Sequence, residues 1–232
     1  MIRINKNLLG AFVLILSFFM HSCAKDSTEN LNASLNDAFA GIAAFNGIQS
    51  TKNLQFLVDG KLINKTEDDF STGGYLNYRT IFPGKRKIDI VSNGNQIYHK
   101  SERDFKDSKF YTYFLFGKNN VEGLVTEDDI IKSNPGKLKI RVVNLVDDLH
   151  PIKLDFNYLN SKFSYNFDSR IYGFHEYSSK ERFKFIISST DKKYNDLEIS
   201  LAGKDRSVNT IVIYTELDDE MKEVLKYKIL EL

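Results

Sequence analysis

The stretch "AFNGIQSTKNLQFLV" (residues 44–58) can be laid over the stretch "VVNLVDDLHPIKLDF" (residues 142–156), 98 positions further along the chain. Identity between the two stretches is low, but nearly the same spacing continues beyond them. At offsets of 98 or 97 positions the matched pairs are Asn46–Asn144, Phe56–Leu154, Tyr75–Tyr172, Ile88–Phe185, Ile90–Ile187 and Thr112–Thr210. An offset that holds within one residue over several segments favours an internal repeat over a chance similarity of two β-rich halves.

Short segments typical of β-strands lie around and between these matched residues. Aromatic and β-branched side chains are enriched in them, and several alternate apolar with polar residues. The clearest are "LQFLV" (54–58), "YLNYRTI" (75–81), "KIDIV" (87–91) and "FYTYFLF" (110–116). No long helical pattern is present, and "LKYKI" (225–229) alternates as a last strand that would pair with "TIVIY" (210–214).

Glycine- and proline-containing turns separate the strand segments. Phe82-Pro83-Gly84 predicts a type II turn, because Pro suits its second position and Gly the following position, where φ is positive. Asn93-Gly94 predicts a tight hairpin, and Asp59-Gly60 and Gly73-Gly74 mark further turns. Asn134-Pro135-Gly136 lies immediately before the first strand segment of the second half and marks the junction between the halves.

Each half approaches the ~100 residues and about seven short strands of an immunoglobulin-like sandwich. We therefore predict an all-β protein of two tandem immunoglobulin-like antiparallel β-sandwich domains, residues 40–134 and 135–232, the second a divergent repeat of the first. They would follow a signal peptide and a flexible tether. The chain has one cysteine, so no internal disulfide can form and packing must stabilise the fold.

The N-terminus resembles a secretory signal. Residues 8–20 form an uncharged run of 13 residues that follows Arg3 and Lys6. A membrane-spanning helix needs ~20 apolar residues, whereas the apolar core of a signal peptide needs only ~7–15 behind a positive start. We predict that residues 1–22 are a lipoprotein signal peptide; the alternative is a buried core helix.

Cys23 is the predicted lipid attachment residue. Met20-His21-Ser22-Cys23 resembles a bacterial lipobox, although His21 departs from the usual small or hydroxylated residue. Bacterial lipoproteins of this kind carry a diacylglycerol and usually an N-acyl chain, so membrane lipid is the expected partner. Residues 23–39 would then form the lipidated N-terminus and a polar tether. Cleavage by an ordinary signal peptidase would instead leave a free thiol in an oxidising compartment.

The net charge and the predicted lipid anchor limit the possible location and partners of the protein. Loss of residues 1–22 removes Arg3 and Lys6 but no acid, leaving 30 basic and 31 acidic residues and a net charge of −1. Nucleic-acid binding requires an excess of basic residues, so no such partner is expected. Ala24 lacks the Asp that favours inner-membrane retention in enteric bacteria. We predict a lipid anchor in the outer membrane, with the protein facing the periplasm or the cell surface.

An ordered series of motifs in the first half resembles one known family. It comprises Asn46, Val58-Asp59-Gly60, Tyr75, Pro83-Gly84, Tyr111-Thr112, Glu127-Asp128-Asp129 and "PGKLKIRVVNL" (135–145). Residues 44–145 thereby resemble the bacterial exported proteins catalogued as domain of unknown function 4397, common among Bacteroidota-type lipoproteins. The resemblance implies a sandwich on a lipoprotein. It implies no activity and no catalytic residue, and the second half lacks the Asp-Gly and Pro-Gly turns.

No motif for catalysis, a metal or a cofactor stands out. His99, His150 and His175 lie in no Gly-x-Ser-x-Gly or His-Glu-x-x-His context. Acidic pairs recur at Asp68-Asp69, Asp128-Asp129, Asp147-Asp148 and Asp218-Asp219, and solvated turn residues are favoured over a calcium site. Tyr78, Tyr113 and Tyr177 lie on predicted strands, where packing is favoured over a binding platform. We predict no catalytic residue, no metal ligand and no cofactor, and the ligand-binding residues remain unassigned.

Three functional classes remain for the envelope protein that these features describe. The favoured class is a non-catalytic binding or adhesion module whose partner is a glycan or an envelope protein, because tethered sandwiches present variable loops. The alternative is a structural or assembly component of an outer-membrane complex. A hydrolase is a remote third alternative, because the catalytic constellations are missing.

Overall fold

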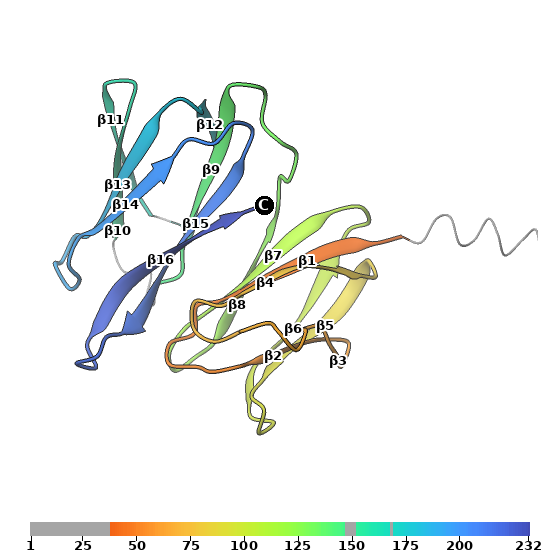
Figure 1. Ribbon diagram of the computed structural model, residues 1–232. Coiled ribbons are helices and arrows are strands. Elements are labelled where there is room, and N and C mark those ends of the chain that lie inside the picture. The colour runs from red at the N-terminus through yellow and green to blue at the C-terminus, as the bar shows by residue number, and fades with distance from the viewer. Residues whose placement is uncertain (1–37, 147–151, 168) are drawn as a thin grey trace, which may run out of the picture. The chain divides into compact units, whose positions relative to one another are not determined.

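The computed structural model describes residues 38–146, 152–167 and 169–232 (Figure 1). The predicted signal peptide, the lipid attachment residue Cys23 and the tether up to residue 37 lie outside these residues, as do Asp147, Asp148 and His150. Phe39–Leu232 forms one compact unit, and every regular element that the structure describes in it is a β-strand. Over the same residues there is accordingly no helix with the length and hydrophobicity needed to span a bilayer.

The first eight strands form one sandwich of two four-stranded sheets. They are β1 (Ala40–Asn46), β2 (Gln55–Val58), β3 (Lys61–Leu62), β4 (Tyr75–Ile81), β5 (Gly84–Val91), β6 (Ile97–Phe105), β7 (Phe110–Phe116) and β8 (Glu122–Glu127). One sheet has the order β4-β1-β7-β8 and the other β3-β2-β5-β6. The pairing is antiparallel except between β1 and β7, which run parallel.

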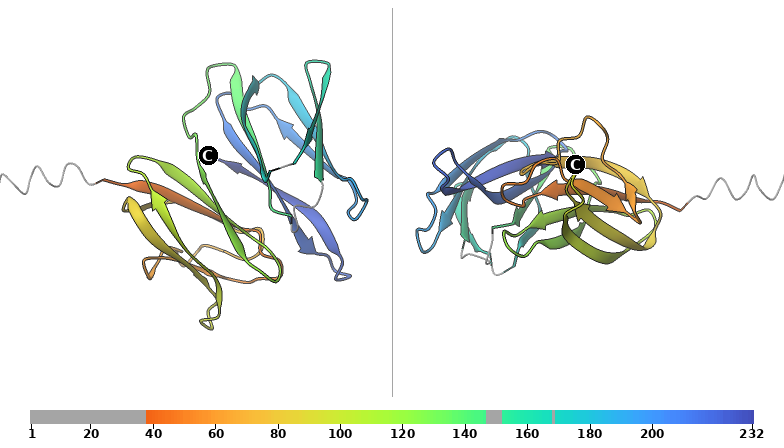
Figure 2. Two further views of the ribbon diagram at one scale, coloured as in Figure 1. Left: turned by 180° about the vertical axis from the view of Figure 1, so that it is seen from behind. Right: turned by 90° about the horizontal axis from the view of Figure 1, so that it is seen from below.

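The remaining eight strands form a second sandwich with the same topology. They are β9 (Lys137–Asn144), β10 (Ile152–Tyr158), β11 (Ser161–Asn166), β12 (Ile171–Ser178), β13 (Arg182–Ser189), β14 (Leu197–Ala202), β15 (Val208–Leu217) and β16 (Glu223–Glu231). The sheet orders are β12-β9-β15-β16 and β11-β10-β13-β14, each label being eight higher than its counterpart in the first sandwich. Figure 2 shows the two layers of each sandwich from behind. The predicted all-β fold of tandem sandwiches is confirmed.

Strand register supports the internal repeat in detail. Phe56 pairs with Ile90 as Leu154 pairs with Ile187, and Thr112 and Thr210 lie opposite residues of β1 and β9 that are 98 positions apart, 43 and 141. One sequence match is wrong by a residue. Tyr172 pairs with Val142, so its structural counterpart is Leu76, which pairs with Ala44, and not Tyr75. A shift of one residue moves a strand side chain to the opposite face of the sheet.

The turns follow the predicted chemistry with one difference. Asp59 and Gly60 both have positive φ, 51° and 78°, in a two-residue hairpin, and Gly84 has the predicted positive φ of 91°. Asn93-Gly94 does lie in the hairpin between β5 and β6, but the positive φ of 62° falls on Asn95. The Asn95 amide donates to Ser92 O at 2.9 Å, so the loop is longer than the tight hairpin that the sequence predicts.

Three apolar clusters hold the compact unit together. One fills each sandwich, and the third joins residues of both sandwiches, most of them on the central strands β1, β7, β9 and β15: Phe45, Phe114, Phe116, Val143, Leu145, Val212, Tyr214 and Leu230. The sheet β4-β1-β7-β8 therefore buries both of its faces at β1 and β7. That is why "FYTYFLF" is apolar along nearly its whole length and does not alternate.

Candidate functional site

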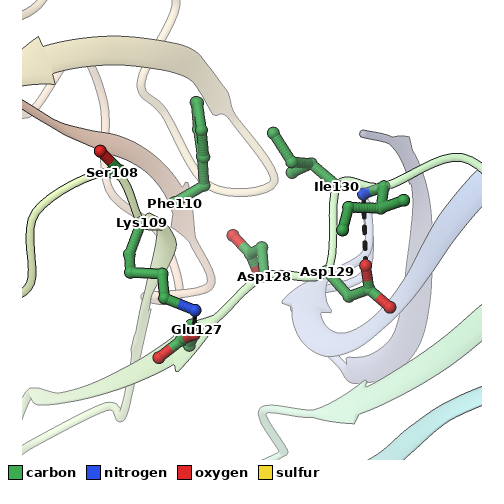
Figure 3. Close-up of a pocket in the computed structure, with 8 residues that line it drawn as sticks. Ser108, Lys109, Phe110, Glu127, Asp128, Asp129 and Ile130 are labelled. Carbon is green, nitrogen blue, oxygen red and sulfur yellow. Dashed lines mark hydrogen bonds and ion pairs between the residues drawn. The ribbon is translucent and has the colours of Figure 1, made fainter.

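A hollow of about 470 Å³ opens at one end of the first sandwich (Figure 3). Residues 108–110, at the start of β7, and residues 127–131, which follow from the end of β8, line it. At its rim, Lys109 Nζ lies 2.7 Å from Glu127 Oε1, and this pairing raises the pKa of Lys109 and lowers the pKa of Glu127. The Asp129 carboxylate accepts a hydrogen bond of 3.2 Å from the Ile131 amide.

Asp128, in the wall of this hollow, turns its carboxylate into a buried polar network. Its Oδ2 accepts hydrogen bonds from Tyr78 (2.7 Å) and Thr112 (2.6 Å), and its Oδ1 accepts one from Thr126 (3.0 Å). The same Oδ1 lies 2.8 Å from Arg141 Nη1, and the two side chains are 0% and 3% exposed. The pair joins the segment after β8 to β9, so it links the two repeats.

The network holds a buried ion pair in a fixed position, and its tyrosine hydroxyls are not suited to proton transfer. Burial is the main cause that raises the pKa values of Tyr75 and Tyr78 far above the ordinary 10, and the negative charge of Asp128 adds to it. Both hydroxyls therefore keep their protons at neutral pH. Each polar group of Asp128 and Arg141 has a partner, as a buried ion pair requires.

The three tyrosines that the sequence places on strands pack as predicted. Tyr113 is fully buried, and its hydroxyl lies 2.7 Å from Ser101 Oγ and 2.8 Å from His99 Nε2. Tyr177 is buried with its hydroxyl 3.0 Å from that of Tyr172. Tyr78 is part-buried on Asp128. None of the three presents an open ring face for a ligand.

The acidic pairs divide into different roles. Asp128 is buried, so the interpretation of the pairs as solvated turn residues is wrong for it, because the guanidinium of Arg141 lies across the repeat junction and compensates its charge. Asp68 forms an ion pair with Arg79, and Asp218 accepts backbone hydrogen bonds within the β15–β16 turn. Across the three described ranges, no group of three or more His, Cys, Asp or Glu side chains is arranged to hold a metal ion.

The remaining histidines lie in different environments. Burial lowers the pKa of His99, whose Nδ1 lies 2.9 Å from Val121 O. His175 is exposed on β12, and its ring lies 4.5 Å from that of Tyr172 at an interplanar angle of 30°. His175 therefore belongs to a surface cluster, whereas His99 belongs to a packed one.

A row of exposed and part-buried rings runs along one side of the second sandwich, and we call it the aromatic edge: Phe163 and Tyr165 on β11, with Tyr172 and His175 on β12. Phe163 is 43% exposed, although it stacks on the buried Phe156 at 5.2 Å. Tyr165 lies edge-on to Tyr172 at 4.7 Å, so the side chains of the two outer strands meet there. Lys162, Ser164 and Asn166 lie on the opposite face of β11, because side chains alternate along a strand.

The corresponding side of the first sandwich is covered. Twelve residues, 63–74, connect β3 to β4 there, whereas only four, 167–170, connect β11 to β12. Asn64 in the longer connection hydrogen-bonds the backbone at β2, and Asp68 forms an ion pair with Arg79 of β4, so this connection bridges the two sheets. The second repeat lacks a connection of that length, and Phe163 and His175 remain exposed.

The sequence predicted neither the aromatic edge nor the buried ion pair. The rings of the edge are spread over two strands that are adjacent only after folding, and "SKFSYN" (161–166) has no distinctive pattern. Arg141 gives a stronger signal, because it is a charged residue between the apolar Ile140 and Val142, at the position that the first repeat gives to Ala43.

Comparison with known proteins gives a family and distant structural likenesses. Residues 40–155 match the family model described as "Domain of unknown function (DUF4397)". No curated protein matches the chain. Among solved structures, CBMbc (family CBM26) from Eubacterium rectale Amy13K, in complex with maltoheptaose, has a TM-score of 0.26 and 9% identity, covering 84% of this chain and 97% of that one.

Two further structures are similar at the same level. The tip fimbrial protein Mfa3 from Porphyromonas gingivalis has a TM-score of 0.26 and 11% identity, covering 85% of this chain and 100% of that one. The Bacillus anthracis TIE protein has a TM-score of 0.26 and 8% identity, covering 84% of this chain and 44% of that one. Likenesses this distant assign neither a ligand nor a role.

Proposed function

The chain belongs to the DUF4397 family, whose description assigns no activity, and we propose that it is a non-catalytic binding module anchored in the bacterial cell envelope. The aromatic edge is its proposed recognition surface. The ligand would be a glycan or an envelope protein.

The exposure of the aromatic edge carries this proposal. Buried rings need no further explanation, but Phe163 at 43% exposure and the exposed His175 present apolar surface to solvent. Rigid aromatic side chains are the anchors that binding loops use, since they provide contact area at a low entropic cost. The rings are preordered by stacking on the core, which reduces the entropy lost on binding.

The groups that acid–base chemistry would use support a non-catalytic role. The carboxylate of Asp128, the guanidinium of Arg141 and the hydroxyl of Tyr78 satisfy one another inside the protein. Tyr113 and His99 are joined in the same way. A general acid or base must instead reach a substrate from a cleft.

Binding is tested with the mature chain on a glycan array and in pull-downs from envelope extracts. Phe163→Ser and His175→Ala should each weaken the captured interaction at least about tenfold, because each removes ring surface from the contact. Leu62→Ser is the matched control, since Leu62 is also exposed but lies on β3 of the first sandwich. Capture that survives both edge substitutions, or no capture at all, would remove the edge as the recognition surface. A membrane complex retained by both variants would favour the assembly role.

Anchoring through Cys23 is the second part of the proposal. Lipobox-like residues precede Cys23, and the compact unit begins 16 positions after it, at Phe39. Cells fed with labelled palmitate should label the wild-type protein and not Cys23→Ser. Protease treatment of intact cells then separates a surface location from a periplasmic one. An unlabelled wild-type protein, released without detergent, would contradict the anchor and the outer-membrane location.

A further inference from the structure

We propose that one end of the first sandwich rests on the lipid bilayer, through four side chains that we call the apolar end: Phe39, Phe82, Phe110 and Ile131. This inference rests on the proposed acylation of Cys23. Phe39, Phe82 and Ile131 are 40%, 70% and 75% exposed, which places them among the large apolar side chains most open to solvent. Exposed apolar side chains that gather at one place mark an interaction surface.

The four side chains lie at the same end of the first sandwich. The ring of Phe39 lies 6.2 Å from that of Phe110 in an edge-to-face arrangement. Phe110 and Ile131 both line the hollow of Figure 3. Phe82 follows Ile81, which pairs with Ala40, so Phe82 and Phe39 lie at the same end of the β1–β4 pair.

The chain enters the compact unit at this surface. The amide of Phe39 donates to Asp107 Oδ1 at 2.9 Å, and its carbonyl accepts from the Ser108 amide at 2.7 Å. These two bonds fix the entry point to the turn between β6 and β7. Any anchor on the N-terminal side of Phe39 is therefore joined to the unit at the apolar end.

The length of chain before Phe39 keeps this surface close to the bilayer. Fifteen residues, 24–38, separate Cys23 from Phe39. Whatever conformation they adopt, they span at most about 55 Å, from ~3.3–3.6 Å per residue. An anchored protein thus meets the bilayer at a high effective concentration, so weak contacts suffice for docking.

The charges around the apolar end favour hydrophobic contact over attraction to anionic lipids. The residues close to the four side chains along the chain carry charges of both signs: Lys85, Arg86, Lys106, Lys109 and Lys132, against Asp107, Glu127 and Asp129. Arg86 and Lys109 form ion pairs with Asp59 and Glu127. Aromatic and branched side chains insert their apolar parts at the boundary between headgroups and acyl chains. Docking should therefore occur on zwitterionic lipid and change little with salt.

The lone cysteine and the absence of tryptophan give a direct test. The mature chain, residues 23–232, is coupled through Cys23 to a maleimide lipid in phosphatidylcholine vesicles, with Phe82→Trp as the only tryptophan. Its emission should shift to the blue and fall at least about twofold when the acyl chains are brominated. Phe163→Trp, a substitution of an exposed ring in the second sandwich, is the matched control and should show neither effect. Urea unfolding verifies that both variants fold.

Three results would overturn the proposal. The first two are a Phe82→Trp emission that brominated lipid leaves unchanged and equal quenching of Phe163→Trp. The third is a blue shift that appears only at high protein density and without quenching, which would indicate contact with a second copy of the chain. Adding Ile131→Ser to Phe82→Trp should reduce the quenching. Because the coupling is chemical, the outcome does not depend on acylation in cells, which the palmitate experiment tests separately.

Discussion

Replacement of Arg141 by Met should destabilise the protein severely, because the buried carboxylate of Asp128 then has no positive charge beside it. The guanidinium lies 2.8 Å from Asp128 Oδ1 and donates to Thr126 at 3.0 Å and to Thr210 at 2.9 and 3.1 Å. It also lies 4.5 Å from the ring centre of Phe174. Met fills similar volume but supplies none of the polar contacts.

The magnitude follows from the burial of both partners. Breaking a buried ion pair by removing one partner costs about 3–5 kcal/mol, since the remaining charge stays desolvated. For a unit of this size, each kcal/mol lowers the melting temperature by about 2–4 °C, so Arg141→Met should melt roughly 6–20 °C below wild type. Replacing both partners by neutral residues leaves no unpaired charge in the interior. The double variant Asp128→Asn/Arg141→Met should therefore cost less than the two single changes added together.

Urea unfolding at 25 °C of the wild type, the two single variants and the double variant measures these free energies. Lys184→Met is the matched control, because Lys184 pairs with Glu198 at 2.7 Å while both side chains are more than half exposed. Surface pairs contribute about 0–1 kcal/mol, so the control should unfold close to wild type. An Arg141→Met variant within about 1 kcal/mol of wild type, or strictly additive single effects, would refute the reasoning.

Three other changes test separate features. Burial lowers the pKa of His99 below its ordinary 6.5, so the unfolded chain takes up the proton first as the pH falls. The stability that neutral His99 permits above pH 6.5 is therefore lost below it. In urea unfolding at successive pH values, His99→Gln should lose less stability than wild type as the pH falls below 6.5. A Cβ at Gly117 (φ 105°) would lie 2.1 Å from a backbone oxygen, whereas one at Gly136 (φ 78°) meets open space. Gly117→Ala should therefore lower the melting temperature clearly more than Gly136→Ala, and equal shifts would contradict the contact. Leu159 and Asn160 form a hairpin turn with φ of 47° and 61°, so the double change to Asn-Gly should raise the melting temperature, because bulky residues disfavour positive φ; a decrease would contradict that.

Strand positions and the internal repeat were accessible from the sequence because they depend on local chemistry. The segments 75–81 and 110–116 are β4 and β7 with the predicted bounds, since aromatic and β-branched residues favour extended backbone wherever they lie. Asn46 and Asn144 end equivalent strands, and in each the side-chain oxygen accepts the amide two residues later. The mismatch at Tyr172 shows the limit of this approach, because a one-residue shift across connections of unequal length leaves no trace in a low-identity alignment.

The sequence by itself determined the all-β class, the two repeats and the family, because each depends on spacing and composition along the chain. Only the tertiary structure decided which polar and aromatic residues are buried. Asp128 is buried because Arg141 packs against it. Phe163 and His175 are exposed because only four residues connect β11 to β12, where the first repeat has twelve. Burial depends on what packs from elsewhere in the chain, and a linear pattern does not record that.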